Sequence, residues 1–266
     1  MKIAIIGTGN LGKSIAKGLI SNNAITSLYL TKRNLDEIAD FKGYKNVHLT
    51  TDNSEAVKQS DILIFAVQPA HFETILKDIK PFLTDKHVLI STITGFSISK
   101  IEEEVGSEQF IIRAMPNTAI AVGKSMTCLC SKTQGEKRIK IAEAIFNRLG
   151  HSLSIPESQM QAATVVCASG IAFWMRLIRA TTQAAIQLGF DAKEAQELAM
   201  FTSEGAANLL ITNGNHPEEE IDRVTTPKGC TIEGLNEMEH KGLSSSLIQG
   251  MVASFNKISN IKKEQI

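Results

Sequence analysis

Three glycines near the start of the chain constrain its fold more than any other feature. They lie in GTGNLG, which directly follows the apolar run KIAII and opens the amphipathic segment KSIAKGLI. In this context the first glycine permits a tight turn, the second lets a pyrophosphate approach the backbone, and the third allows the helix to pack on the strand. The sequence therefore predicts a strand–loop–helix unit that binds a dinucleotide at the helix N-terminus. The residues expected to line this site are Ile6, Gly7, Thr8, Gly9, Asn10, Leu11 and Gly12.

Residues 1–157 alternate short β-branched runs with longer amphipathic segments. We expect strands at KIAII, SLYLT, DILIFAV, HVLIST, QFIIRA, SMTCLC and SLSI. Strands separated by helices are typical of parallel βαβ units, so this part is predicted to be a Rossmann-type α/β domain with a parallel sheet. One outer helix is expected from residue 139, because apolar residues recur there three or four apart until Gly150 ends it.

Residues 158–266 have a different texture, without strand-like runs. Helical spacing covers 159–188, 192–212, 231–240 and 244–263, which predicts an all-helical C-terminal domain. Asp191 followed by Glu194 predicts an N-terminal helix cap. The first of these helices is apolar nearly all round from Met160 to Trp174. We therefore expect it to be buried against a second copy, in a homodimer through the C-terminal helices, with higher assembly left open.

The composition argues against several classes of partner. Lys plus Arg equals Asp plus Glu at 28 each, so the net charge offers no field for nucleic acid or an anionic membrane. The cysteines and histidines lack zinc-site spacing, and Cys128 and Cys130, two apart in an expected strand, are predicted to be buried reduced thiols. The apolar runs are too short for a secretory signal or for the ~20 residues of a membrane span. A cytoplasmic protein without metal, nucleic-acid or membrane partners is expected.

The end of the second expected strand indicates which nicotinamide coenzyme is used. An acidic side chain at this point would hold a ribose 2′-hydroxyl, but the chain has Thr31, Lys32 and Arg33, followed by Asn34, and no carboxylate. Two cations can pair with a 2′-phosphate by charge-assisted hydrogen bonds, so we expect NADP as cofactor, with NADPH preferred over NADH. The alternative is a solvated basic turn, since Lys-Arg pairs are common on surfaces.

The second half lacks the acid–base groups of a carbonyl reductase. Reducing a carbonyl requires a proton donor for the forming alkoxide. Tyr29 and Tyr44 are followed four residues later by Arg33 and His48, so neither forms a Tyr-x-x-x-Lys pair, and 159–188 contains no Lys or His. A protonated imine escapes this requirement, because the nitrogen keeps the proton it already holds. Imine reduction therefore suits a site of hydroxyls and backbone amides.

Residues 224–232, VTTPKGCTI, offer such a site between two expected helices. Unpaired amides at the start of the following helix can hold a carboxylate. The alternative is a helix cap, because Thr226 before Pro227 is a common helix start. The two interpretations are compatible, since a cap that leaves amides free also binds anions.

Five motifs together resemble the pyrroline-5-carboxylate reductase family. They are IIGTGNLG at the start, AVQP at 66–69, MPNT at 115–118, ASGIAF at 168–173 and VTTPKGCTIEGL at 224–235, and only the last is specific to the family. The resemblance runs the full chain. It implies a Rossmann-type domain followed by helices that interlock two protomers, and the NADPH-dependent reduction of 1-pyrroline-5-carboxylate to L-proline, the last step of proline biosynthesis.

The resemblance also implies roles for individual residues. Thr231 is expected as the catalytic residue that donates a hydrogen bond to the ring nitrogen. The amides of Gly229, Cys230 and Thr231, with the Thr226 hydroxyl, are expected to bind the substrate carboxylate, in a pocket between the nicotinamide and the partner's C-terminal helices. Further residues implied along the coenzyme are Asn53, Ala66, Val67, Gln68, Pro69 and Asn117.

The chain departs from the family pattern in three places. Gln68 stands where many members have Lys, Lys228 replaces the first Gly of the signature pair, and ASGIAF replaces G-S-G-P-A-Y. These substitutions keep two alternatives open. One is a related NADP-dependent imine or 3-hydroxyacid reductase on the same fold, and the other is a nucleotide-sensing module without turnover.

Overall fold

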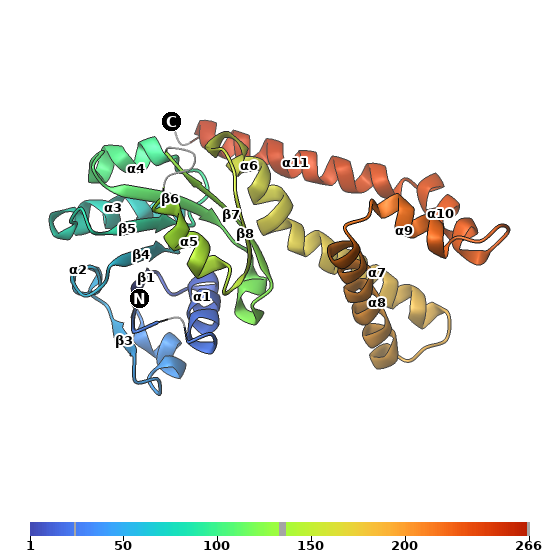
Figure 1. Cartoon of the computed structure of the whole chain (residues 1–266), viewed down its shortest axis with the longest axis horizontal. Helices are drawn as coiled ribbons and strands as arrows, with labels where there is room; N and C mark the ends of the chain where they lie inside the picture. The colour runs from blue at the N-terminus through green and yellow to red at the C-terminus, as the bar shows by residue number, and fades with distance from the viewer. Residues whose placement is uncertain (24, 133–136, 265–266) are drawn as a thin grey trace. The chain divides into compact units, whose positions relative to one another are not determined.

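The computed structural model describes residues 1–23, 25–132 and 137–264 (Figure 1). The chain divides into two compact units, Met1–Ser169 with Phe255–Ile266, and Gly170–Ser254. The first unit contains the sheet and the second consists of helices. The domain boundary between residues 157 and 158, which the sequence predicts from the end of the strand-like runs, stays a prediction.

Eight strands form one sheet in the order β3-β2-β1-β4-β5-β6-β7-β8. The strands are β1 (Lys2–Ile6), β2 (Ser27–Thr31), β3 (Val47–Thr50), β4 (Ile62–Phe65), β5 (Val88–Ser91), β6 (Phe110–Met115), β7 (Ser125–Ser131) and β8 (Gly150–Ser154). The predicted α/β class is confirmed, but β3 was not predicted, because this edge strand alternates polar and apolar residues over only four positions.

One strand pair departs from the predicted parallel sheet. β6 and β7 pair antiparallel, whereas the other neighbouring pairs are parallel. Between them lies only a short 3-10 turn, η3 (Thr118–Val122). Parallel neighbours need a crossover of a dozen or more residues, so the short connection reverses the chain direction.

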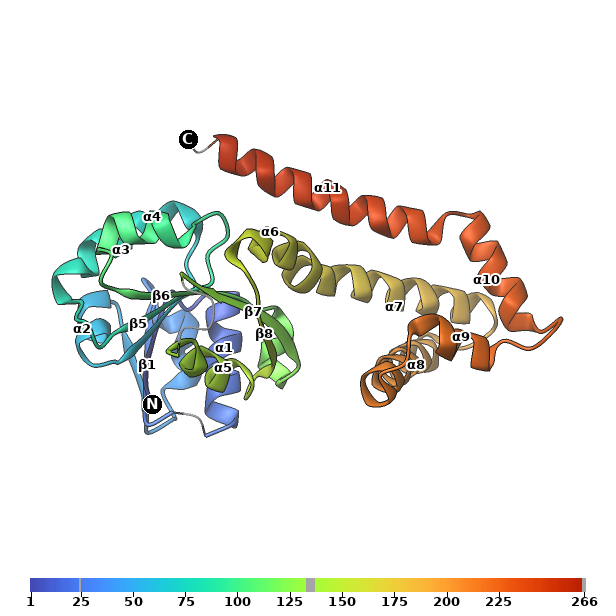
Figure 2. The same ribbon diagram turned by 45° about the horizontal axis from the view of Figure 1, so that its top comes forward.

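Two layers of helices cover the sheet. Side chains alternate along each strand, so Ile3 and Ile5 of β1 pack with α1 (Asn10–Ser21) and α5 (Ile139–Phe146). Ala4 and Ile6 pack with α2 (Asn53–Lys58), α3 (Pro69–Ile79) and α4 (Ile98–Val105). Figure 2 shows α1 and α5 on one face of the sheet and α3 and α4 on the other. The layers also contain two 3-10 segments, η1 (Leu35–Phe41) and η2 (Lys80–Phe82).

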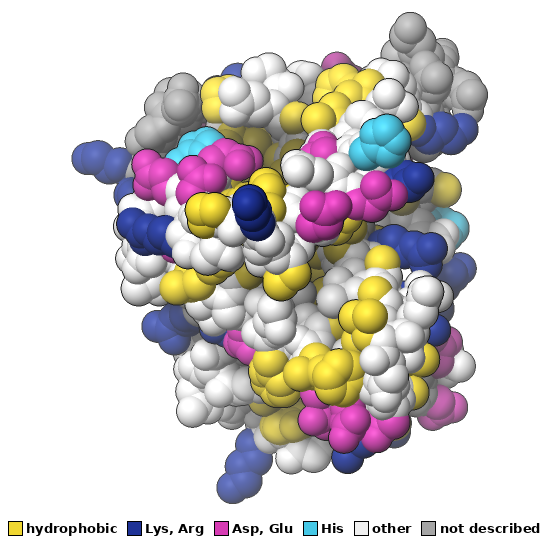
Figure 3. Space-filling model, turned by 90° about the vertical axis from the view of Figure 1, so that its right-hand side faces the viewer, with side chains coloured by type: hydrophobic (Ala, Val, Ile, Leu, Met, Phe, Trp, Pro, Cys, Tyr) yellow, Lys and Arg dark blue, Asp and Glu magenta, His cyan; other side chains and the backbone are white. Residues whose placement is uncertain are grey.

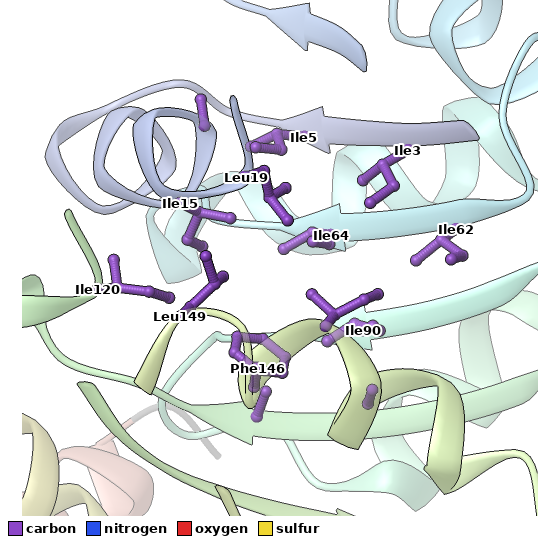
Figure 4. Packing of buried hydrophobic residues seen from close by; sticks show 14 of the residues in the cluster. Ile3, Ile5, Ile15, Leu19, Ile62, Ile64, Ile90, Ile120, Phe146 and Leu149 are labelled. Atoms are coloured by element: carbon purple, nitrogen blue, oxygen red, sulfur yellow. The ribbon is translucent and has the colours of Figure 1, made fainter. Parts of the chain in front are cut away.

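The layer of α1 and α5 shows how the core is built. Figure 4 shows side chains from these helices pointing toward those of the central strands, and Ile15, Leu19 and Phe146 are fully buried there. Burying one such side chain stabilises the fold by about 2 kcal/mol. The core therefore fixes the central strands, whose carboxyl ends carry the loops described below.

The predicted end of α5 at Gly150 is wrong. The helix ends at Phe146, and Gly150 instead begins β8 with a φ of +142°. A Cβ at this position would overlap the backbone of Ser125. Glycine is therefore required by the close approach of β7 and β8, and not by a helix terminus.

The cysteines of β7 are free and buried, as predicted. Cys128 and Cys130 belong to the same apolar cluster, which shows that they share a face of the sheet. Burial raises the pKa of Cys130 to about 11. Its thiol is therefore protonated at neutral pH.

The predicted helix at 159–188 is built from consecutive segments of different geometry. η4 (Glu157–Gln159) is followed by α6 (Met160–Ala163). The π-helical turn η5 (Thr164–Ser169) comes next, and α7 (Gly170–Gln187) ends the series. By length and composition alone, Glu157–Gln187 is the one helix in the described chain that could cross a membrane, with 22% of its most apolar window buried. The expectation that no segment reaches this length is wrong for this helix. The absence of a membrane partner stays a prediction.

The second unit is helical, as predicted, but it buries few of its apolar side chains. It contains α7, α8 (Ala192–Asn213), α9 (Pro217–Val224), α10 (Cys230–His240) and the first part of α11 (Leu243–Glu264). Asp191 caps α8 by accepting from the amides of Lys193 and Glu194 at 2.9 and 3.0 Å. Trp174 is 62% exposed within one chain, and Figure 3 shows hydrophobic side chains at the surface on the side where α8, α9 and α10 are drawn. These side chains leave an apolar surface for a partner to cover.

Candidate active site

A cleft opens in the first unit where the strand order reverses between β1 and β4. Ligands of open α/β sheets bind at such a reversal, beyond the carboxyl ends of the strands. The cleft has a volume of about 650 Å³, and the loops after β1, β2 and β4 line it together with α3. Ten of the residues predicted for the coenzyme line it: Gly7, Thr8, Gly9, Thr31, Lys32, Arg33, Asn53, Ala66, Val67 and Gln68.

The glycine loop after β1 has the shape that a pyrophosphate requires. Gly7 has a φ of +92°, and a Cβ there would overlap Val67, while a Cβ on Gly12 would overlap the carbonyl oxygen of Gly7. Gly9 has no neighbouring atom within 4 Å of its Cβ position, so a ligand can approach its backbone closely. α1 begins after Gly9 without a side-chain cap. Its first amides are thus available to a phosphate.

The end of β2 holds the glycine loop in place. The hydroxyl of Thr31 accepts from the Gly7 amide at 3.1 Å, and the Thr31 carbonyl accepts from the Thr8 amide at 2.9 Å. Lys32 Nζ donates to the Thr8 carbonyl at 3.1 Å. Thr8 Oγ1 is buried and has no hydrogen-bond partner within the described chain, which leaves it for a ligand. The residues present therefore fit a dinucleotide.

The prediction that this strand end has no carboxylate is wrong. Glu37, from η1, lines the cleft, and its Oε2 lies 2.8 Å from Lys32 Nζ. A hydrogen bond from the Lys32 ammonium, together with its charge, lowers the pKa of Glu37. The sequence signal was a glutamate six residues after the strand, but its approach to Lys32 depends on the path of the 3-10 turn.

Sequence reasoning also missed part of the wall of this cleft. His71, Thr74 and Ile75 are on α3, within two turns of the predicted residue Gln68, and they line the cleft. Thr74 and Ile75 lie three and four residues after His71, which itself closely follows the motif AVQP. This helical spacing could have identified them. Asn34 and Thr51, in the loops that follow β2 and β3, complete the lining.

Six predicted coenzyme residues do not line this cleft. They are Ile6, Asn10, Leu11, Gly12, Pro69 and Asn117. Ile6 is buried at the end of β1, and Pro69 begins α3. Asn117 accepts from the Ala119 amide at 2.9 Å and donates to the Cys167 carbonyl at 3.0 Å, so it joins η3 to the π-helical turn. Contacts of these six residues with a coenzyme stay predictions.

The four predicted substrate-binding residues lie together in the second unit, where α9 leads into α10. α10 begins at Cys230 with Gly229 as its N-cap, and no side chain caps it. Thr226 is not the cap of this helix, because the Thr226 carbonyl accepts from the Gly229 amide at 2.9 Å and the helix starts only after this turn. The amides of Cys230 and Thr231 at the first turn of α10 thus remain available for an anion.

Comparison with known proteins assigns the family. Residues 157–261 match pyrroline-5-carboxylate reductase dimerisation, and residues 2–95 match the NADP oxidoreductase family described as coenzyme F420-dependent. Pyrroline-5-carboxylate reductase 2 of Dictyostelium discoideum is 41% identical over 274 residues, covering 97% of this chain and 92% of that protein. The chain belongs to the pyrroline-5-carboxylate reductase family.

Other relatives extend this result. Pyrroline-5-carboxylate reductase 1 of Dictyostelium discoideum is 44% identical over 97% of this chain, which spans about half, 49%, of that relative's length. The crystal structure of Plasmodium falciparum pyrroline carboxylate reductase with NADP bound has a TM-score of 0.88 at 26% identity and covers 98% of both chains. A Coxiella burnetii pyrroline-5-carboxylate reductase has a TM-score of 0.89 at 29% identity over 97% of both.

Lys228 is the departure from the reductase signature that the structure explains most directly. It has a φ of +60°, in the left-handed region that favours glycine, which the family pattern has at this position. Lysine pays a steric cost of about 1 kcal/mol there.

We expect Lys228→Gly to raise the free energy of unfolding by about 0.5 kcal/mol, because the greater freedom of glycine in the unfolded chain offsets part of the relieved strain. Urea denaturation at a fixed protein concentration measures this change. Lys241→Gly is the contrast, because Lys241 has right-handed helical φ and ψ values at the end of α10 and glycine should destabilise it. Equal losses in both variants would contradict the strain at Lys228.

Proposed function

We propose that this chain catalyses the NADPH-dependent reduction of 1-pyrroline-5-carboxylate to L-proline, as the last step of proline biosynthesis. The observation that carries the proposal is the 41% identity to a named pyrroline-5-carboxylate reductase over nearly the full length of both proteins. The glycine loop and the uncapped start of α10 support it, because they offer one site for a dinucleotide and one for a carboxylate.

The coenzyme is assigned to the cleft of the first unit. The amides at the start of α1 would hold the pyrophosphate, and Lys32 and Arg33 would pair with a 2′-phosphate. Bound NADPH supplies the hydride. The Plasmodium falciparum relative with NADP bound supports this choice of coenzyme.

The substrate is assigned to the first turn of α10. The amides of Cys230 and Thr231 would bind its carboxylate, with the hydroxyl of Thr226, whereas the predicted amide of Gly229 already donates to the Thr226 carbonyl. Thr231 would donate a hydrogen bond to the lone pair that develops on the ring nitrogen as hydride adds to the ring carbon. Because an imine nitrogen already carries its proton when the ring is cationic, these groups need only hold and orient the ring.

We propose a homodimer through the C-terminal helices as the working state, and the cytoplasm as its location. The match of 157–261 to the dimerisation family supports homo-oligomerisation. The exposed side chains Trp174, Met175 and Phe201 would be covered in that interface, which supports a protein partner for this apolar surface.

The test follows the loss of absorbance of reduced nicotinamide when the purified chain receives 1-pyrroline-5-carboxylate. We expect turnover with NADPH, and turnover with 1-pyrroline-5-carboxylate faster than with the six-membered imine or a 3-hydroxyacid. A chain that binds NADPH without oxidising it in the presence of any of these compounds would be the nucleotide-sensing module instead. Turnover confined to the other two substrates would assign the related reductase.

A further inference from the structure

We infer that Glu37 is a specificity-determining residue that weakens binding of a coenzyme 2′-phosphate and narrows the preference for NADPH over NADH. The inference rests on the proposed function, because it concerns the coenzyme of that reaction. It starts from the position of Glu37, which lines the same cleft as Thr31, Lys32 and Arg33.

The fold holds Glu37 at this position. Asn34 caps η1 by accepting from the Asp36 amide at 3.1 Å, and Ile38 and Phe41 anchor the turn in the core of the first unit. The carboxylate of Glu37 is thereby held beside the end of β2, although 55% of its side chain is exposed. A ligand at this strand end meets a carboxylate on a fixed turn.

Glu37 also engages the ammonium that would bind a 2′-phosphate. Lys32 Nζ lies 2.8 Å from Glu37 Oε2 and 3.1 Å from the Thr8 carbonyl oxygen, and its side chain is only 18% exposed. A phosphate must therefore compete with Glu37 for this cation. Without a rearrangement, Lys32 has one N–H left for a new partner.

The charges around Glu37 keep it ionised. Lys32 lowers its pKa most strongly, first by a hydrogen bond, and Lys13 and Arg33 lower it further through their charges. At neutral pH a 2′-phosphate carries a charge of about −1.5 to −2. The Glu37 carboxylate, which the nearby cations keep ionised, therefore repels it. The ribose 2′-hydroxyl of NADH, in contrast, can donate to such a carboxylate, as it does to acidic residues at this strand end in other dinucleotide sites.

The test is equilibrium binding by calorimetry with 2′,5′-ADP and 5′-AMP, which differ only in the 2′-phosphate. Glu37→Gln in the full chain removes the charge and keeps the size. We expect it to bind 2′,5′-ADP about tenfold more tightly, and 5′-AMP within about twofold of the unsubstituted chain. Arg33→Ala should weaken the binding of 2′,5′-ADP and leave the binding of 5′-AMP unchanged.

Asp36→Asn is the matched control, because Asp36 is an exposed carboxylate on the same turn that does not line the cleft. It should change neither affinity by more than about twofold. An unchanged affinity of Glu37→Gln for 2′,5′-ADP would overturn the inference, and so would an equal gain in affinity in Asp36→Asn. A weaker affinity of Glu37→Gln would also overturn it, because Glu37 would then position Lys32 for the phosphate.

The failure of this inference is distinguishable from failure of the proposed function. If the unsubstituted chain oxidises NADPH with 1-pyrroline-5-carboxylate while Glu37→Gln leaves both nucleotide affinities unchanged, only the role of Glu37 is lost. If the unsubstituted chain binds neither nucleotide, both the coenzyme assignment and the role of Glu37 are lost.

Discussion

Thr231→Ala is expected to lower kcat with 1-pyrroline-5-carboxylate about 100-fold, with little change in coenzyme affinity. As hydride adds to the ring carbon, a lone pair develops on the ring nitrogen, and the proposed Thr231 hydroxyl donates to it. This hydrogen bond is strongest in the transition state, so its loss falls on kcat more than on KM. Steady-state oxidation of NADPH measures kcat and KM, and calorimetry with NADP⁺ measures the affinity for the coenzyme.

Three further variants separate this role from a structural one. Thr231→Ser keeps the hydroxyl and should recover most of kcat. Thr226→Ala should raise KM, because its hydroxyl is assigned to the substrate carboxylate. Thr225→Ala is the control, since that hydroxyl already donates to the Ile221 carbonyl within α9 at 2.8 Å. A serine variant as slow as the alanine variant, or an undiminished kcat in Thr231→Ala, would remove Thr231 from the mechanism.

The features of this fold that could be predicted are those encoded by neighbours in the sequence. The glycine loop is recognised from its spacing and its place between a strand and a helix, and the structure gives Gly7 and Gly12 positions that exclude any Cβ. The central strands are recognised because they are apolar on both faces. The edge strand β3 was missed because its residues are only half buried.

The features that could not be predicted depend on the path of the chain between elements. β7 runs antiparallel to β6 because the connection between them is short. The positions of the strands alone do not take the length of this connection into account. Glu37 reaches Lys32 only because a 3-10 turn follows β2. The helix predicted at 231–240 begins at Cys230, and the alternative start at Thr226 fails because Lys228 adopts a left-handed conformation, which its side chain does not favour.

Glu157→Ala is expected to lower the free energy of unfolding by about 3 kcal/mol. One carboxylate oxygen, Glu157 Oε1, accepts from Arg113 Nη1 at 2.9 Å and from the Ile98 amide at 2.8 Å, so it joins β6 to the start of α4. Arg113 is 6% exposed, and its Nε is buried without a hydrogen-bond partner among the described residues. Removing the carboxylate therefore leaves a buried positive charge uncompensated. The effect is placed at the lower end of the range for buried pairs because 34% of the Glu157 side chain is exposed.

Urea denaturation at a fixed protein concentration measures this change, because the proposed dimer formation would make the stability depend on concentration. Lys132→Ala, which breaks the pair between Glu102 and Lys132 by removing a side chain that is 64% exposed, is the control and should cost less than about 1 kcal/mol. Adding Arg113→Met to Glu157→Ala should restore part of the loss, since it removes the buried charge and keeps an apolar side chain of similar length. If Glu157→Ala cost no more than Lys132→Ala, or if the double variant were less stable than Glu157→Ala, the unpaired charge of Arg113 would not be the cause.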